Sequence, residues 1–485
     1  MDQPFKTVQK AADVTDPGDT VQLMNGTYQE SGAGWDVVHI KRSGKPGAPI
    51  TFEPVPGHHP VIHPVTGWNG IQIAGASFIR IRNLEIAGNA KNIDLGQARQ
   101  QAGQAKPVFN TNCVSATKDP KSGAQAHDLE ITGNHVHHCP GAGISAIDAD
   151  HVTIDHNQVH ANSWFTEYGC SGISILRALD SDHGDPSRYK IRITENTVYD
   201  NETKVPWVKI GRFSDGNGII IDTLKAKDTQ DPDYQGRVLV AGNVSFDNGG
   251  SGIHSFKSQH VDIVNNTAYR NSRSTNMEGY ANIFAAQSTD VRVLNNISVM
   301  SPDKPANSTN KNTDVTYDYN IYFGGKKPET MGPHDLVTDP KLTKASTDPA
   351  TADFRPAEGS PAIDSGTAFD LPAQDLSGRP RKAGSALDRG ALELVKGAPA
   401  KAEAPAATSE APAAGNAAQS TTAADPTTAT AAVTTEVANA SDGKPADGLA
   451  FTGADVITAA AVGALALAAG VFLVLFTRRK RARKS

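Results

Sequence analysis

Short apolar strands separated by polar turns recur along most of this chain. One strand in each cycle begins with a Gly–Ile step, at Gly70-Ile71, Gly143-Ile144, Gly172-Ile173, Gly218-Ile219 and Gly252-Ile253. The intervals Ile144 to Ile173, Ile219 to Ile253 and Ile253 to Ile283 are 29, 34 and 30 residues. Repetition at such a period is typical of a solenoid, in which each cycle packs only on its neighbours.

The strands are rich in Ile, Val and Thr, and Gly, Asn and Asp separate them. This composition favours β-structure, and the absence of a sustained 3.6-residue period argues against helical repeats. Three short strands in each cycle fit one coil of a right-handed parallel β-helix, whose successive coils lie about 4.8 Å apart. We therefore predict an all-β solenoid of this type, with the repeated Ile side chains stacked in its core.

An asparagine marks a second repeated position, after the next strand of each cycle. It occurs at Asn134, Asn157, Asn196, Asn243, Asn266 and Asn296. Asparagine tolerates left-handed backbone, and its amide can satisfy the polar groups of a buried turn. These residues are therefore predicted to form an internal stack with a structural role.

Both ends of the repeated region resemble a known group. PFKTVQKAADVTDPGDTVQLMNGTYQE (4–30) resembles the start of bacterial, pectate-lyase-like parallel β-helix proteins, where a short amphipathic helix caps the open end. Segments 352–366 and 374–394 resemble the closing segment of choice-of-anchor β-helix proteins. The resemblance implies a cap with the first coils (1–60), a β-helix core (61–345) and a closing segment (346–396). It does not specify the reaction, since the fold carries lyases, hydrolases, epimerases and adhesins.

The C-terminal part has a different composition. Residues 397–448 are mostly Ala, Thr, Pro and Glu and are predicted to be a disordered wall-spanning linker, because they cannot bury enough apolar surface to fold. Segment 449–485 contains LAFTG, an apolar run of 21 residues from Val456 to Phe476, and the basic end RRKRARK. The apolar run is long enough for one transmembrane helix, and the basic end favours an internal C-terminus.

This order resembles the LAXTG-type sorting signal of Gram-positive bacteria, the actinobacteria in particular, with the motif at Leu449, Ala450, Phe451, Thr452 and Gly453. The resemblance implies that a sortase cuts after Thr452 and joins it to peptidoglycan, so that the protein is held in the cell wall. A plain membrane anchor is the alternative. An exported protein needs an N-terminal signal. The predicted cap follows Met1 directly, so we expect the native start to lie upstream.

The composition limits the classes of partner that the protein is expected to bind. The formal net charge is −6, and no basic stripe with interleaved aromatic residues occurs, so nucleic-acid binding is not expected. A monomer is expected. The three cysteines, Cys113, Cys139 and Cys170, lie at different offsets from the Ile of their coils and are therefore predicted to be buried thiols.

Two long intervals point to a functional face. The steps Ile71 to Val114 and Ile173 to Ile219 are 43 and 46 residues, which indicates polar insertions at 91–110 and at 180–190 or 202–215. Enzymes of this fold bind a sugar chain along one strand face between long turns. The predicted site therefore lies on the coils of Ile173, Ile219 and Ile253, where Asp148, Arg177, Thr223 and Lys257 occupy equivalent outward offsets.

Segments 213–222 and 248–258 are faintly similar to the calcium-and-base arrangement of family 9 pectate lyases. The similarity implies that Asp215 and Asp222 bind Ca²⁺. The place of the lysine base is taken by His254, with Lys257 three residues on. Abstraction of a proton α to a uronate carboxylate needs a base, such as His254 titrating near neutrality, and a cation, from Ca²⁺ or Arg177. We therefore predict a polysaccharide lyase with His254, Lys257, Arg177 and Asp222 as catalytic residues.

Other interpretations stay open. A glycoside hydrolase would use two carboxylates of the set Asp148, Glu167, Asp180, Asp182, Asp215, Asp222 and Glu278. A glycan-binding adhesin would use none, and Asp215 and Asp222 would then be ordinary turn residues.

Candidate substrate-binding residues are Trp164, Tyr168 and Trp207, with Asp148 and Glu278. Their aromatic rings either stack on sugar rings or pack under the long turns. The His-rich segment 133–139 is a weaker metal candidate, because no second ligand cluster follows at a matching spacing.

Overall fold

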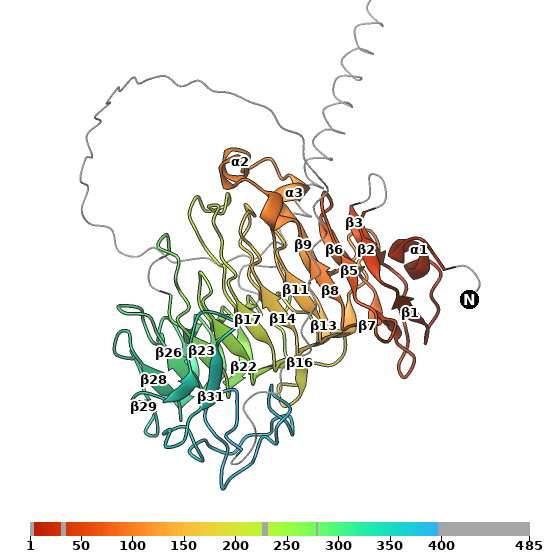
Figure 1. Ribbon diagram of the computed structural model, residues 1–485. Helices are drawn as coiled ribbons and strands as arrows, with labels where there is room; N and C mark the ends of the chain where they lie inside the picture. Colours follow the sequence, from red (N-terminus) through yellow and green to blue (C-terminus); the bar gives the residue numbers. More distant parts are fainter. Residues whose placement is uncertain (1–3, 31–34, 226–230, 278–279, 396–485) are drawn as a thin grey trace, which may run out of the picture. The chain divides into compact units, whose positions relative to one another are not determined.

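The computed structural model describes residues 4–30, 35–225, 231–277 and 280–395. All but two of its strands form three parallel sheets, in which neighbouring strands come from successive coils, as Figure 1 shows. This arrangement confirms the predicted parallel β-helix. The predicted linker, membrane span and sorting signal, including Leu449, Ala450, Phe451, Thr452 and Gly453, lie outside the described residues, as does Glu278.

The coils up to β24 contribute one strand to each sheet, and the coils after it contribute strands to sheets A and B only. Sheet A consists of β1 (Thr20–Leu23), β4 (Ile50–Pro54), β7 (Ser77–Arg82), β10 (His127–Thr132), β13 (Asp150–Asp155), β16 (Tyr189–Thr194), β19 (Arg237–Ala241), β22 (Gln259–Val264), β25 (Thr289–Leu294) and β27 (Thr313–Asp318). Sheet B consists of β2 (Gly26–Tyr28), β5 (Pro60–Ile62), β8 (Glu85–Ala87), β11 (His135–His137), β14 (Gln158–His160), β17 (Thr197–Tyr199), β20 (Val244–Phe246), β23 (Thr267–Tyr269), β26 (Ile297–Val299), β28 (Ile321–Phe323) and β29 (Leu336–Val337). Sheet C consists of β3 (Asp36–Ile40), β6 (Asn69–Ala74), β9 (Asn112–Thr117), β12 (Ile144–Ile147), β15 (Ile173–Leu176), β18 (Ile219–Asp222), β21 (Ile253–Phe256) and β24 (Ile283–Ala286).

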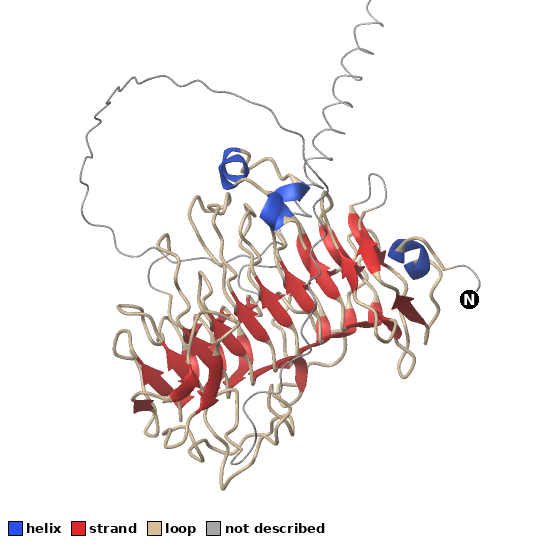
Figure 2. Cartoon of the chain, in the orientation of Figure 1, coloured by secondary structure: helices blue, strands red, loops and turns tan. Residues whose placement is uncertain are grey.

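Helices are short and lie outside the sheets (Figure 2). They are α1 (Val8–Ala12), α2 (Leu95–Gln100), α3 (Pro107–Asn110) and a 3₁₀ turn, Ala90–Asn92. The last three belong to the insertion predicted at 91–110. Thr7 caps α1 by accepting a hydrogen bond from the N–H of Lys10, and Gln9 bonds to the backbone of His39 in β3. In the described part of the chain, no helix has the length and apolarity needed to cross a membrane.

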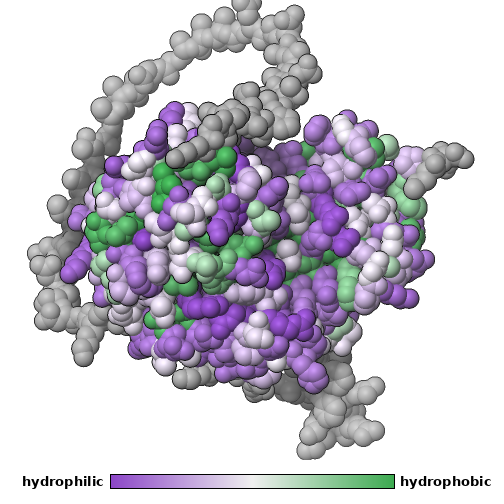
Figure 3. All heavy atoms as spheres, turned by 90° about the horizontal axis from the view of Figure 1, so that it is seen from below, coloured by the Kyte–Doolittle hydropathy of each residue, from purple (hydrophilic) through white to green (hydrophobic). Residues whose placement is uncertain are grey.

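The core is the column predicted from the Gly–Ile steps. Ile144, Ile173, Ile219, Ile253 and Ile283 are paired in register along sheet C and are fully or almost fully buried. Side chains of the other two sheets complete a single apolar cluster between the sheets. Figure 3 shows one outer face of the molecule, where hydrophilic side chains prevail between small apolar patches.

The asparagine stack is also confirmed, and it continues to Asn320. In each step the backbone N–H and the Nδ2 of one asparagine donate to the Oδ1 of the next, for example from Asn157 to Asn196 at 2.9 and 3.0 Å. The sequence interpretation missed a second stack, at the turns that lead into sheet C, formed by Asn162, Asn201, Asn248, Asn271 and Asn282. Both stacks satisfy buried polar groups that the turns would otherwise leave without partners.

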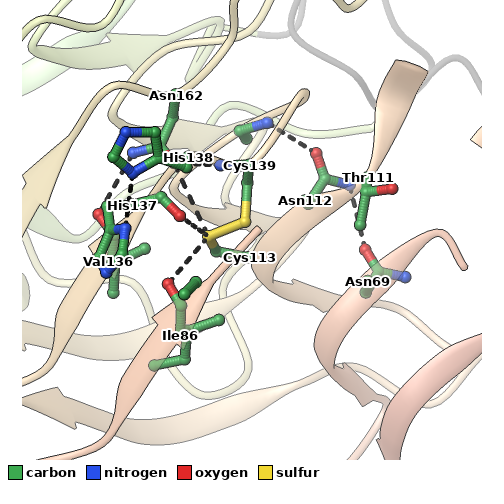
Figure 4. The surroundings of a disulfide bond; sticks show 12 residues. Asn69, Ile86, Thr111, Asn112, Cys113, Val136, His137, His138, Cys139 and Asn162 are labelled. Atoms are coloured by element: carbon green, nitrogen blue, oxygen red, sulfur yellow. Dashed lines mark hydrogen bonds between the residues drawn. A yellow bond between two sulfur atoms is a disulfide. The ribbon is translucent and has the colours of Figure 1, made fainter. Parts of the chain in front are cut away.

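The prediction of buried thiols is wrong for two of the three cysteines. Cys113, at the start of β9, and Cys139, just after β11, form a disulfide with Cα atoms 5.5 Å apart (Figure 4). Their offsets differ because residues 139–143 form a turn that brings Cys139 back against the previous coil. Cys170 is a buried thiol, as expected.

The closing segment covers the outer face of sheet B at its C-terminal coils. Its two strands, β30 (Leu342–Lys344) and β31 (Asp353–Pro356), pair in antiparallel fashion. Phe354 packs on Phe246 and Tyr269, and buried Arg381 forms an ion pair with buried Glu195.

Replacing one asparagine of the first stack should destabilise the fold. Asn196→Ala leaves the two donors of Asn157 and the carbonyl of Ile154 without their partner, which should cost about 2–4 kcal/mol. Urea unfolding followed by circular dichroism measures this change. Asn92→Ala, on an exposed turn, is the matched control, with an expected effect below about 0.5 kcal/mol. Equal midpoints for the two variants would contradict a structural role of the stack.

Candidate functional site

The outer face of sheet C carries the residues that the sequence singled out. Long turns flank it, since residues 161–172 and 200–218 enter strands β15 and β18, and 177–188 leaves β15. One outward row runs Ser145, Ser174, Ile220, His254 and Phe284, and the next runs Ile147, Leu176, Asp222 and Phe256. All of these side chains are buried. This face is therefore an enclosed environment in which the cost of a charge is high.

Two carboxylates in this environment have few partners. Asp215 and Asp222 are both fully buried. Thr223 Oγ1 donates to one oxygen of Asp222 at 2.6 Å. Among the described residues, the other oxygen of Asp222 and both oxygens of Asp215 accept no hydrogen bond of ordinary geometry. Burial raises the pKa of Asp215 to about 7, although the side chain of Ser214 lies close enough to lower this pKa slightly. Burial also raises the pKa of Asp222 well above its ordinary value, and the charge of Asp215 adds to this second shift.

Positive side chains lie beside the carboxylates. Asp148, Arg177, Thr223 and Lys257 all have left-handed backbone, with φ between 48° and 53°, which confirms that they occupy one equivalent turn position. The guanidinium of Arg177 binds both carboxylate oxygens of Asp148, at 3.1 and 3.3 Å. The charges of Lys257 and Arg177 act to lower the pKa of Asp222, although burial outweighs them. The structure therefore brings Arg177, Lys257 and Asp222 together, as predicted.

His254 does not titrate near neutrality, and that expectation is wrong. Its ring stacks on Phe284 with centroids 4.6 Å apart, and its Nδ1 lies 2.5 Å from Ser251 Oγ. Burial lowers the pKa of His254 to about 3, because the ring lies in the outward row between Ile220 and Phe284. Spacing places the ring on this face but carries no information about how deeply the face is covered.

The predicted sugar platforms are mostly part of the protein's own packing. Trp207 is buried, with only 3% of its surface exposed. Trp164 donates from Nε1 to the carbonyl of Asp200 and packs in the apolar cluster under the 91–110 insertion, with Lys204 over its ring. Tyr168 is half-buried. These positions favour the packing interpretation for the two tryptophans.

Several carboxylates of the hydrolase alternative already have partners. Glu167 accepts hydrogen bonds from the N–H groups of Gly103 and Ala105. Asp180 and Asp182, with Asp150, surround the buried Lys190 Nζ at 2.8, 2.7 and 2.6 Å. Lys190 therefore supplies a cation to that acidic cluster.

The donor set at Asp215 and Asp222 fits a hard cation only in part. Three carboxylate oxygens are without partners, and Ca²⁺ prefers oxygen ligands. In the described part of the chain, no third carboxylate or histidine completes a ligand group with these two. Water or a substrate carboxylate would have to supply the remaining ligands.

One polar atom of this face was missed by the sequence interpretation. Ser174 Oγ is buried without a hydrogen-bond partner in the described structure, like the oxygens of Asp215 and Asp222. Ser174 lies beside Ile220, which precedes His254 in the same row. Ser174 occupies the same outward offset as His254, so the sequence pattern that indicated His254 also indicates Ser174.

A hollow with a volume of about 510 Å³ lies over sheet A. Its lining includes Arg80, Glu130, Lys190 and Arg192. Arg80 pairs with Glu130 at 3.1 Å, and Lys190 is held by the three aspartates. Arg192 instead lies over the ring of Tyr189, with 5.1 Å to the ring centroid. Most of the charged side chains that line this hollow are thus in contact with side chains of the protein itself.

The comparisons with known proteins concern the fold. Residues 69–223 and 122–298 match the family model described as "Right handed beta helix region". The parallel β-helix seen in this part of the chain agrees with that description. No curated protein matches the sequence.

Among solved structures, pectate lyase Pel9A matches with a TM-score of 0.46 and 15% identity, over 80% of this chain and 90% of that one. The A-module of mannuronan C-5 epimerase AlgE6 from Azotobacter vinelandii gives 0.35 and 16%, over 68% and 92%. The GH136 lacto-N-biosidase from Eubacterium ramulus gives 0.38 and 12%, over 70% and 64%. These TM-scores are all below 0.5, so the similarities give no information about the functional site.

Removing the carboxylate of Asp215 should stabilise the β-helix. The folded pKa of about 7 exceeds the ordinary 3.8, so wild-type stability falls as the pH rises through this window. Asp215→Asn lacks this titration. At pH 8, with EDTA present to remove divalent cations, the free energy of unfolding of Asp215→Asn should exceed that of wild type by up to about 4 kcal/mol. At pH 4 the two proteins should be equally stable.

Urea unfolding at several pH values measures this effect. Asp314→Asn, which removes an exposed carboxylate, is the matched control and should show no pH-dependent gain. The same pH dependence in wild type and Asp215→Asn would show that Asp215 carries no unpaired buried charge.

Proposed function

We propose that the protein acts on an extracellular polysaccharide at the outer face of sheet C, and that it cleaves a uronate-containing chain by β-elimination. The observation that carries this proposal is the pair Asp215 and Asp222, buried without adequate partners beside Arg177 and Lys257. Unpaired buried carboxylates lower stability, and such costs are characteristic of functional sites.

The chemistry assigns a role to each group. In β-elimination a base takes the proton α to the uronate carboxylate, and the oxygen on the β-carbon leaves as a double bond forms. Arg177 is the candidate for binding the uronate carboxylate, which would replace Asp148 as the partner of the guanidinium. Lys257 lies beside Asp222 and is the candidate base, since His254 is a weak base at its lowered pKa.

Calcium fits this scheme as a partner of the two aspartates. Asp215 and Asp222 would hold the ion, which when bound supplies positive charge next to the substrate carboxylate. Both carboxylates are buried, so a sugar reaches them only when the chain covering the face moves.

Glycoside hydrolysis is the second candidate. The raised pKa values of Asp215 and Asp222 keep a carboxyl group protonated near neutral pH, as a general acid requires. A hydrolase would need the second carboxylate as base or nucleophile. A non-catalytic glycan-binding protein would use the same face without either chemistry.

We further propose that the protein is held in the wall of a Gram-positive cell through Thr452. The sorting-signal resemblance motivates this placement, and the disulfide supports it, because disulfides persist in oxidising compartments outside the cytosol. Mass spectrometry of protein released from purified walls should find a C-terminus at Thr452 joined to a peptidoglycan fragment. Release of protein that ends beyond Gly453 would contradict it.

Activity assays separate the candidates. Purified protein with Ca²⁺ should release unsaturated, ultraviolet-absorbing products from polyuronates. Asp222→Asn and Lys257→Ala should each lower kcat by at least about 100-fold, and Asp314→Asn should leave it unchanged. Reducing ends without the absorbance would favour the hydrolase. The absence of any product from uronates and neutral glycans would refute an enzyme.

A further inference from the structure

The outer face of sheet B carries a cluster of histidines that the proposed reaction does not use. The histidine cluster consists of His135 and His137 on β11, His138 just after it, and His160 on β14, with Glu85 on β8. In the register of the sheet, Glu85 lies opposite His135, and His137 lies opposite His160. Three successive coils therefore bring their imidazole and carboxylate groups to one place.

The ligand atoms of this cluster face one another. One ligand atom from each of Glu85, His135 and His137 lies within 4.8 Å of the other two. Glu85 Oε1 is 3.2 Å from His137 Nε2. In a tetrahedral zinc site with bonds of about 2.0–2.1 Å, neighbouring ligand atoms lie about 3.3 Å apart. The contact between Glu85 and His137 is therefore close to one edge of such a tetrahedron.

The other two histidines support these groups. His138 Nδ1 is 2.7 Å from His137 Nδ1, and His160 Nε2 is 2.9 Å from His135 Nε2. A ligating imidazole usually donates its other N–H to a neighbour, which fixes the ring and the tautomer. With Nε2 of His137 on a metal, its Nδ1–H would donate to His138.

A purely structural role explains only part of this cluster. The rings of His137, His160, Tyr199 and Phe246 stack in one row along sheet B, and the closing segment covers the row at Phe246. Stacking accounts for the rings in that row. The ring of His135 also packs on His137 and His160, with centroids 4.2 and 5.1 Å away. Ring packing does not account for Glu85, whose carboxylate lies in the adjacent row with a ligand atom near those of His135 and His137.

The site is accessible and mechanically supported. Of the Glu85 and His137 side-chain surfaces, 39% and 12% are exposed, so an ion can enter from solution. The disulfide between Cys113 and Cys139 adjoins His138 and joins the same part of the solenoid, and Figure 4 shows His137 and His138 next to it. Cys113 Sγ lies 3.7 Å from the carbonyl oxygen of His137. The backbone that carries the ligands is thus fixed by a covalent bond.

We propose that Glu85, His135 and His137 bind a divalent transition-metal ion of the zinc type, with a fourth position open to solvent. Two imidazoles and one carboxylate form a known zinc ligand set, and imidazole also suits copper and nickel. The ion would join the coils of β8 and β11 on a face separate from sheet C.

Titration of the full-length protein with Zn²⁺ tests the site, in the presence of excess Ca²⁺ to occupy carboxylate sites. Calorimetry should give one Zn²⁺ per chain. Glu85→Gln, His135→Gln and His137→Gln should each weaken binding by more than the roughly 10–100-fold that loss of a supporting group costs. His138→Gln should weaken binding within that range. His334→Gln, at a half-exposed histidine far along the chain, should leave it unchanged.

A second measurement guards against misfolded variants. His137→Phe keeps a ring in the stacked row and removes the ligand, so its metal-free circular dichroism should match that of wild type while Zn²⁺ binding is lost. Co²⁺ should give the visible absorption of a low-coordinate site in wild type and not in His137→Phe. Absence of stoichiometric Zn²⁺ binding, or binding that survives in all three ligand variants, would overturn the proposal.

Discussion

Parallel pairing of each strand with the equivalent strand of the next coil is the constraint on which the described structure depends. It repeats every side chain position about 4.8 Å further along the solenoid. Apolar residues then stack into the core, and asparagines stack at the turns, where each amide bonds to the next coil. The same repetition forces outward residues of neighbouring coils into contact. Both candidate sites are products of this geometry.

The two clusters of aspartates differ in how their negative charge is neutralised. At Asp150, Asp180 and Asp182 the chain supplies its own cation, and Lys190 neutralises the group within hydrogen-bond distance. At Asp215 and Asp222 three of the four carboxylate oxygens have no hydrogen-bond partner among the described residues, and burial raises both pKa values. A buried charge without a partner destabilises the fold. The arrangement at Asp215 and Asp222 is therefore expected where a ligand supplies the missing partner.

The sequence predicted the parts of the molecule that depend on repetition. Spacing alone placed Ile219 and Ile253 in the core and Asn196 in the stack, and it brought Arg177, Asp222 and Lys257 to one face. The spacing did not predict how deeply the outer face of sheet C is buried. The long turns beside this face differ in length from coil to coil, so they do not follow the repeat. For this reason the spacing could not show that the ring of His254 is buried, or decide whether Trp207 stacks on sugar or packs inside the protein.

Contacts between different coils were also beyond the spacing argument. Cys113 and Cys139 occupy different offsets, and a turn of irregular length brings them together. Glu85 and His160 lie far in sequence from His137, and only the register of β8, β11 and β14 unites them.

The most direct test of the account is a crystal structure of the Asp222→Asn variant with a bound uronate oligosaccharide. The account predicts that the sugar chain lies along the outer face of sheet C, with one carboxylate bound by Arg177 and close to Lys257 and Asp215. A sugar bound in the hollow over sheet A, with the sheet C face still covered, would contradict it.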